Sequence, residues 1–186
     1  MTTDTVTGRR AFPWGWLAPS AVVLGAMATW GALRYPEVPE RVPRHIGPGG
    51  VDAWTDKSVW TVFVPVFVYA ALTLVLAACA AAAARTRSLD AMPGPSGPWE
   101  QAAASMTNRP ATAASARRLA RSLLLMNAGL GLALLPPCWT QWRTTQTAGI
   151  PGWILPATIA ALVLSLVPLV LAWRYDAQAR RARRPA

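Results

Sequence analysis

Four long apolar stretches dominate the pattern of hydrophobic and polar positions along the chain. A helix needs about 20 mostly apolar residues to cross the hydrocarbon core of a bilayer, and each stretch reaches or approaches that length. The stretches are Ala11–Leu33, Ser58–Ala84, Ser122–Trp139 and Pro151–Trp173, and none contains Asp, Glu, Lys, Arg or His. A soluble helical core would carry a charged face opposite its apolar stripe. The pattern therefore predicts an all-α integral membrane protein, in which residues 1–186 form a single four-transmembrane-helix bundle.

Composition supports the membrane class, and the distribution of the basic residues argues against nucleic-acid binding. The chain is 53% hydrophobic and only 14% charged, which is unusual for a soluble domain. Its formal net charge of +10 is of the kind found in nucleic-acid-binding proteins. However, the basic residues lie in short runs beside the apolar stretches, and no helix-turn-helix, zinc-finger or aromatic-sheet motif accompanies them. We therefore expect no nucleic-acid partner and assign the basic runs to membrane topology.

The distribution of Lys and Arg predicts the orientation, because cytoplasmic segments of membrane proteins retain positive charge. If both termini are cytoplasmic, 13 of the 18 basic residues lie inside, in the N-terminal tail, the linker 85–118 with the foot of the third span, and the C-terminal tail 174–186. The opposite orientation reverses that ratio. Nine of the ten tryptophans also lie near predicted span ends, where indoles favour the interface. We expect a multi-pass protein of the cell membrane with both termini in the cytoplasm.

The third span has the weakest pattern of the four. We place it at residues 119–139, with Arg121 at its foot reaching the inner headgroups and Pro136-Pro137 interrupting its outer end. A basic helical segment is expected to run into this span from the linker. Asn127 lies within the span, and we interpret it as a donor of hydrogen bonds between helices rather than as a transport site.

Other span residues predict details of packing. Pro65 and Pro168 lie inside the second and fourth spans, where they are expected to kink the helices. The run Ala77–Ala84 is a smooth surface that allows another helix to approach closely. Cys79 and Cys138 are expected near opposite membrane faces, too far apart for a disulfide, and are interpreted as small packed residues.

The first span has an alternative interpretation as a cleaved signal peptide. Arg9-Arg10 resembles part of a twin-arginine signal, and Ala26-Met27-Ala28 is a small-residue cleavage site. The apolar region is 23 residues long, whereas a signal peptide carries about 7–15. The length favours a retained span, and either reading leaves the other three spans in the same orientation.

The segment 34–57 between the first two spans carries most of the functional information. Pro36, Pro39 and Pro43 favour an extended, polyproline-like path, and Gly47–Gly50 then forces a turn. We therefore predict a Pro/Gly-rich extracytoplasmic loop.

A purely structural interpretation of the end of this loop is also available. Asp52 or Asp56 is then the N-cap of the second span. Trp54 and Lys57 are then its interfacial anchors.

The same segment resembles a known family. The pattern is Pro39-x-x-x-Pro43-x-His45, a glycine-containing turn, and then Asp52-x-Trp54-x-x-Lys57. It is similar to the bacterial membrane domain of unknown function numbered sixteen-forty-eight, which is also found at the start of SdpI-type toxin immunity proteins. Two features differ from the family pattern: Ile46 replaces a usual aromatic, and the His45–Asp52 spacing is about one residue short. The resemblance implies an integral membrane protein and allows an immunity-like role.

The loop residues also have to be considered as a chemical site. His45 lies in the same loop as the carboxylates Glu37, Glu40 and Asp52, and an imidazole with carboxylates can bind a metal or move a proton. This single histidine lacks an HExxH helix, a CxxC pair and a Gly-x-Ser-x-Gly elbow. We therefore expect no enzyme activity, no metal site and no cofactor.

Two classes of function remain after these exclusions. The first is a binding or sensing module that presents the loop to an extracytoplasmic peptide, a lipid or a membrane-protein partner. Its candidate residues are Pro39, Pro43, His45, Asp52, Trp54 and Lys57. The second is a subunit of a transporter or of a larger membrane complex. Ion-coupled transporters place ionisable residues inside their spans, and these apolar stretches contain none, so the binding module is preferred.

Overall fold

The computed structural model of the protein describes residues 12–47, 49–92, 97–100, 108–143, 145 and 147–182. The arginines at positions 9, 10, 183 and 184, Pro48, and residues 93–96 of the predicted linker lie outside the described residues. The described helices and strands are α1 (Ala18–Arg34), β1 (Arg41–Gly47), β2 (Gly50–Asp56), α2 (Val59–Val62), α3 (Val64–Arg85), α5 (Ala113–Gln141), α6 (Ile154–Ser165) and α7 (Val167–Arg181).

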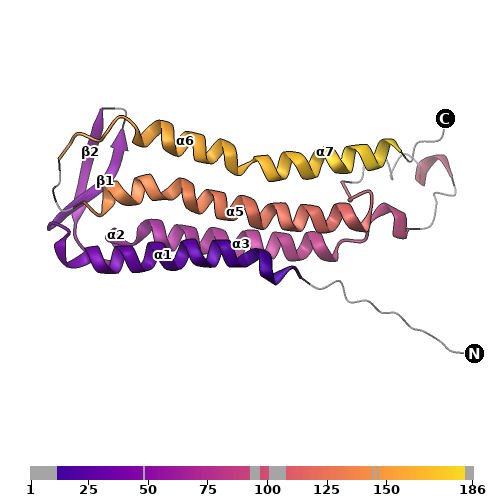
Figure 1. Ribbon diagram of the computed structural model, residues 1–186, viewed down its shortest axis with the longest axis horizontal. Coiled ribbons are helices and arrows are strands. Elements are labelled where there is room, and N and C mark those ends of the chain that lie inside the picture. Colours follow the sequence, from indigo (N-terminus) through magenta and orange to yellow (C-terminus); the bar gives the residue numbers. More distant parts are fainter. Residues whose placement is uncertain are drawn as a thin grey trace, which may run out of the picture.

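Four helical stretches within the described residues are long and apolar enough to cross a membrane. They contain α1, α3, α5, and the α6–α7 pair, and these helices lie side by side along the long axis of the molecule (Figure 1). The four predicted spans are therefore confirmed. The third is longer than predicted, because the basic segment before it and the apolar run form one continuous helix of 29 residues.

Prolines break two of the four spans. The predicted second span is interrupted at Phe63, where α3 begins with Pro65 in its first turn, and the fourth at Leu166, just before Pro168. Both breaks lie where the sequence predicted a kink. In the third span, however, α5 continues through Pro136 and Pro137 to Gln141, so the predicted interruption there is wrong.

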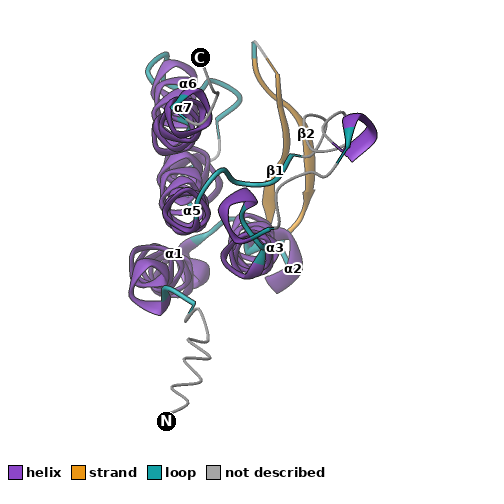
Figure 2. Cartoon of the chain, turned by 90° about the vertical axis from the view of Figure 1, so that its right-hand side faces the viewer, coloured by secondary structure: helices purple, strands orange, loops and turns teal. Residues whose placement is uncertain are grey.

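Helix α5 is central in the bundle. It packs against α1, α3, α6 and α7, and Figure 2 shows it end-on between α1 and the α6–α7 pair. Its small residues permit this closeness. A Cβ atom on Gly131 would lie 2.3 Å from Cζ of the fully buried Tyr69 on α3, and one on Gly129 would lie 2.7 Å from Cβ of Ser165. Glycines at these two positions let α3 and α6 approach α5 directly.

Polar and alanine-rich contacts complete the interior. Asn127 is fully buried on α5, and its Nδ2 donates to Oγ of Ser20 on α1 at 2.8 Å and to Oγ1 of Thr73 on α3 at 3.0 Å. This confirms the predicted hydrogen bonds between helices. The alanine run of α3 also packs as predicted, because Ala80 and Ala84 form a buried cluster with residues of α5.

The two cysteines occupy different environments. Cys79 is exposed and Cys138 is buried, and both are free thiols. The prediction that they do not pair is confirmed, but the interpretation of Cys79 as a packed residue is wrong, because its side chain is exposed.

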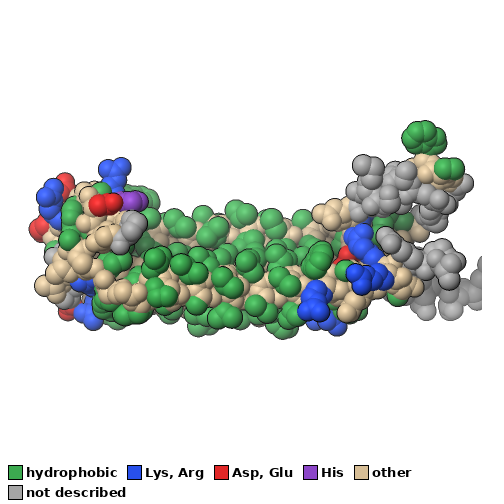
Figure 3. All heavy atoms as spheres, turned by 90° about the horizontal axis from the view of Figure 1, so that it is seen from above, with side chains coloured by type: hydrophobic (Ala, Val, Ile, Leu, Met, Phe, Trp, Pro, Cys, Tyr) green, Lys and Arg blue, Asp and Glu red, His purple; other side chains and the backbone are tan. Residues whose placement is uncertain are grey.

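The surface divides into an apolar waist and two charged ends, as Figure 3 shows. One end comprises β1, β2 and the connection between α5 and α6, and we call it the hairpin end. At the other, which we call the tail end, α5 begins and α7 finishes (Figure 1). An apolar waist of this kind matches the hydrocarbon layer of a bilayer.

The segment between the first two spans is a β-hairpin, so the all-α and polyproline-loop predictions need correction. The segment is extended and turns near Gly47–Gly50 as expected, but its arms pair as antiparallel strands β1 and β2. Two paired arms satisfy backbone groups that an isolated polyproline path would leave to water.

Candidate functional site at the hairpin end

The hairpin forms because its sequence alternates residues suited to strands with residues suited to turns. Val42 and Val51 are β-branched and buried, and a residue of this kind packs well on a pleated strand. Gly50 follows the turn with a φ of +120°, a conformation that residues with a Cβ rarely adopt. Pro43 has no N–H to donate, which a two-stranded hairpin tolerates because every strand is an edge.

The hairpin is held rigidly to the helices on two sides. At its stem, Val38 and Val42 are buried in the same core cluster as Met27 and Trp142. At its tip, the N–H of Val51 donates to the carbonyl oxygen of Ala148 in the α5–α6 connection, at 2.8 Å. The hairpin is therefore an integral part of the bundle end.

Two β-bulges bring His45 and Asp52 together. In the register, Pro43 faces Trp54 and His45 faces Ala53, which leaves Arg44 as an extra residue in β1. Asp52 is the corresponding extra residue in β2, because Ile46 faces Val51. Bulges redirect side chains locally.

The resulting contact is short and exposed. Nδ1 of His45 lies 2.6 Å from Oδ1 of Asp52. The side chains are 67% and 58% exposed, respectively. The two candidate residues that the sequence placed in one loop thus form a hydrogen-bonded pair on the surface.

Lys57 lies elsewhere, at the base of the hairpin. Its Nζ donates to the carbonyl oxygen of Val38 at 2.7 Å and lies 4.9 Å from the ring centroid of Tyr35. Its backbone N–H donates to the carbonyl oxygen of Glu40, also at 2.7 Å. Lys57 therefore fastens the two ends of the hairpin together, and the structure separates it from the His45–Asp52 pair.

The remaining candidates also divide between surface and support. Trp54 is half-buried opposite the buried Pro43, and Pro39 is half-buried before β1. Pro43 also lines a groove of about 370 Å³ between the hairpin and the helices. The groove is lined by Pro43, Arg44, Thr55, Thr61, Val64, Pro65 and Gln141. Only Pro43 among the predicted site residues reaches this groove.

The predicted helix cap is wrong. Neither Asp52 nor Asp56 caps the second span, because Ser58 is its N-cap. The Ser58 side chain accepts from the N–H of Thr61 at 3.1 Å, and Thr61 Oγ1 accepts from the N–H of Ser58 at 2.8 Å. This reciprocal capping box satisfies two backbone donors at the helix start. Asp52 is thereby left without a role in helix capping.

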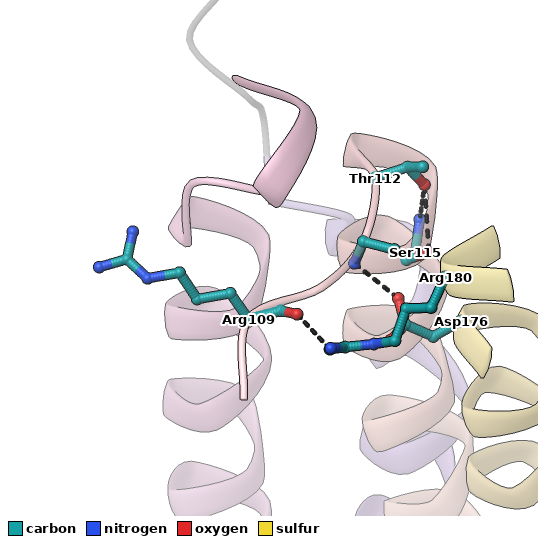
Figure 4. Close-up of polar contacts among 6 residues, drawn as sticks. Arg109, Thr112, Ser115, Asp176 and Arg180 are labelled. Atoms are coloured by element: carbon teal, nitrogen blue, oxygen red, sulfur yellow. Dashed lines mark hydrogen bonds and ion pairs between the residues drawn. The ribbon is translucent and has the colours of Figure 1, made fainter. Parts of the chain in front are cut away.

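A second polar cluster, which the sequence analysis missed, lies at the tail end (Figure 4). Asp176 on α7 accepts from the backbone N–H of Ala111 at 2.7 Å and from Nε of Arg180 at 2.7 Å. Nη2 of Arg180 also donates to the carbonyl oxygen of Arg109. Asp176 is the only acidic residue after Glu100, which was an available signal in the sequence. The cluster ties the segment before α5 to the end of α7.

The donor set at the hairpin end does not resemble a metal centre. Within the part of the chain that the structure describes, no group of three or more His, Cys, Asp and Glu side chains converges. His45 and Asp52 alone offer two ligands, whereas structural zinc sites use about four.

Comparison with known families bears on the hairpin. Residues 22–68 match the family model described as domain of unknown function (DUF1648). The match includes most of α1, the whole hairpin and the start of α3, and it confirms the resemblance that the loop pattern indicated. Comparisons with curated proteins and with solved structures found no match.

Proposed function

We propose that the hairpin end is an extracytoplasmic recognition surface at which His45 and Asp52 bind a peptide or a membrane-protein partner. The observation that carries the proposal is a hydrogen-bonded pair, 67% and 58% exposed, on a hairpin that other residues hold in place. Exposed pairs of this kind stabilise a fold by only about 0.2–1 kcal/mol. The hairpin is stabilised by the buried Val38 and Val42 and by the hydrogen bonds of Lys57, and not by this pair.

The pair offers specific chemistry to a ligand. In the neutral tautomer with a proton on Nδ1, the carboxylate accepts from Nδ1–H and Nε2 is an acceptor. In that tautomer the pair presents acceptors that suit N–H or O–H donors such as those of a peptide. We propose binding rather than catalysis, because the sequence places no HExxH, CxxC or Gly-x-Ser-x-Gly motif with this pair.

The proposal requires the hairpin end to face the outside, as the 13-to-5 asymmetry of basic residues predicts. In a variant lacking Cys79 and Cys138, single cysteines are placed at Gly49, Thr145 or Ala179, and sealed cells are treated with an impermeant maleimide. Positions 49 and 145 should react, and position 179 should react only after permeabilisation. Labelling of position 179 alone in sealed cells would reverse the orientation and exclude an extracytoplasmic site.

Recognition itself is tested by photo-crosslinking in the native host. A photoreactive amino acid at Ile46, which is exposed beside the pair, should capture a partner in the wild-type background. His45→Ala or Asp52→Ala should remove the adduct without lowering membrane abundance. The matched control is Arg41→Ala, an exposed position on the same strand, which should keep the adduct. An adduct that persists in both site variants would exclude the pair as the recognition element.

A further inference from the structure

A second hollow lies at the hairpin end, away from the His45–Asp52 pair and between the ends of α1 and α5. Its volume is about 240 Å³, well above the roughly 15 Å³ that a single water requires. It is lined by Trp30, Arg34, Trp139, Trp142, Arg143 and Thr145. Two guanidinium groups and three indoles therefore share one cavity, and the described lining includes no carboxylate.

Arg143 is oriented before any ligand arrives. Its Nη2 donates to Oγ1 of Thr147 at 2.6 Å, and its Nη1 donates to the carbonyl oxygen of Gly149 at 3.3 Å. The guanidinium also lies 5.2 Å from the ring centroid of Trp139. A guanidinium fixed in this way loses little side-chain entropy when it binds an anion.

Arg34 supplies the second charge from the end of α1. Its Nη1 lies 2.9 Å from Oε2 of Glu37, and its side chain is 48% exposed. An exposed pair at i,i+3 contributes little free energy. The phosphate group of a ligand in the cavity can therefore compete with Glu37 for this guanidinium.

The tryptophans that line the cavity form a rigid aromatic wall, and they lie at the helix ends, at the level of the lipid headgroups. Trp142 is 2% exposed, its Nε1 donates to the carbonyl oxygen of Val62 at 2.9 Å, and its ring lies 5.1 Å from that of Trp30 in an edge-on contact. A Cβ on Gly31 would lie 2.9 Å from Cζ2 of Trp142, so glycine is needed beneath this ring. Tryptophans at the ends of membrane helices mark the level of the lipid headgroups.

From this juxtaposition we propose that the cavity binds a phosphate group, supplied either by a phospholipid headgroup or by free phosphate. Guanidinium groups bind phosphate oxygens through paired, charge-assisted hydrogen bonds. The indoles provide an amphipathic wall that suits the glycerol region of a lipid. This site is independent of the His45–Asp52 pair, because the two share no residue.

The proposal is tested with the purified full-length chain in a neutral detergent, by native mass spectrometry. Dioleoyl phosphatidylglycerol is titrated, with dioleoylglycerol as the matched lipid that lacks phosphate and sodium phosphate as the competitor. The variants are Arg34→Gln and Arg143→Gln, with Arg143→Lys in reserve should the glutamine variant not fold. Arg41→Gln at the same end, outside the cavity, is the control.

We expect each glutamine variant to bind phosphatidylglycerol about tenfold more weakly, because each loses a charge-assisted hydrogen bond. Arg41→Gln and wild type should bind it equally, and dioleoylglycerol should bind to neither. Competition by sodium phosphate would identify free phosphate as a source, and its absence would identify the lipid headgroup. Equal binding by wild type and both arginine variants, or equal binding of dioleoylglycerol, would overturn the proposal.

Discussion

Asp52 at the hairpin end and Asp176 at the tail end are both carboxylates with an imidazole or cationic partner, yet their surroundings differ. Asp52 lies 2.6 Å from His45, and its side chain is 58% exposed. Asp176 lies 2.7 Å from Arg180, and its side chain is 21% exposed. Asp176 also accepts from the N–H of Ala111, which is 65 residues away in sequence. Asp52 thus joins two adjacent strands, whereas Asp176 joins distant parts of the bundle.

The difference in burial and in the distance along the chain between partners distinguishes polar residues that stabilise the fold from those that are accessible to a ligand. At the tail end, the carboxylate accepts from a backbone N–H and from Nε of a guanidinium, and such donors are costly to leave unpaired. At the hairpin end, water can replace either member of the pair. Similar side-chain chemistry therefore stabilises the fold at one end, whereas at the other it is compatible with the recognition role that we propose.

The largest expected effect is at the tail end. Asp176→Ala should lower the free energy of unfolding by about 2–3 kcal/mol, because it leaves the N–H of Ala111 and Nε of Arg180 without their acceptor. Denaturation of the purified protein in mixed detergent micelles measures the change. The photo-adduct at Ile46 should be retained wherever the variant still folds. A loss below about 0.5 kcal/mol, the usual range for surface substitutions, would remove the contrast between the two ends.

The next effect concerns how firmly the hairpin is docked. Gly50→Ala should cost about 1–2 kcal/mol, because its φ is +120° and the added Cβ would lie 2.1 Å from the carbonyl oxygen of Ala148. Hydrogen exchange at the N–H of Val51 should accelerate. The adjacent Gly49→Ala, which would meet nothing within 4 Å, is the matched control. Equal exchange in both variants would mean that the hairpin tip does not depend on this contact.

A smaller effect is expected in the apolar waist. Thr73→Val removes one acceptor of Asn127 while preserving shape, and hydrogen bonds between membrane helices are worth about 0.6 kcal/mol on average. Thr158→Val is the matched control, since Thr158 Oγ1 donates to the carbonyl oxygen of Ile154 within its own helix. Steric trapping of the two variants measures the difference. If Thr158→Val lowers the free energy of unfolding as much as Thr73→Val does, the hydrogen bond between helices contributes no more stability than one within a helix.

Features with a local cause could be predicted from the sequence. The four spans follow from uncharged apolar runs, and the breaks before Pro65 and Pro168 follow from the missing proline N–H. Asn127 was foreseen as a donor between helices because a buried amide in a span needs partners. The strand pairing was not foreseen, because Pro39 and Pro43 suggest an unpaired path and the register depends on tertiary docking through Val42 and Val51.

The site was predictable as a set of residues but not as an arrangement. His45 and Asp52 were identified from the family-like pattern, and their contact depends on two bulges that no local signal announces. Lys57 belongs to the same pattern, but the structure separates it from the pair, because its Nζ donates to the carbonyl oxygen of Val38. Ser58 was passed over as a cap because two aspartates nearby have the same preference.

The smallest expected change in stability tests the central claim most directly, that the His45–Asp52 pair serves recognition and not the fold. His45→Ala and Asp52→Ala are each expected to alter the free energy of unfolding by less than about 1 kcal/mol, since both side chains are exposed. Unfolding and membrane abundance are measured in the same variants as the photo-adduct at Ile46. The account predicts that the adduct is lost while stability and abundance stay near wild type. Parallel loss of adduct, abundance and stability would show that the pair supports the hairpin and would contradict the account.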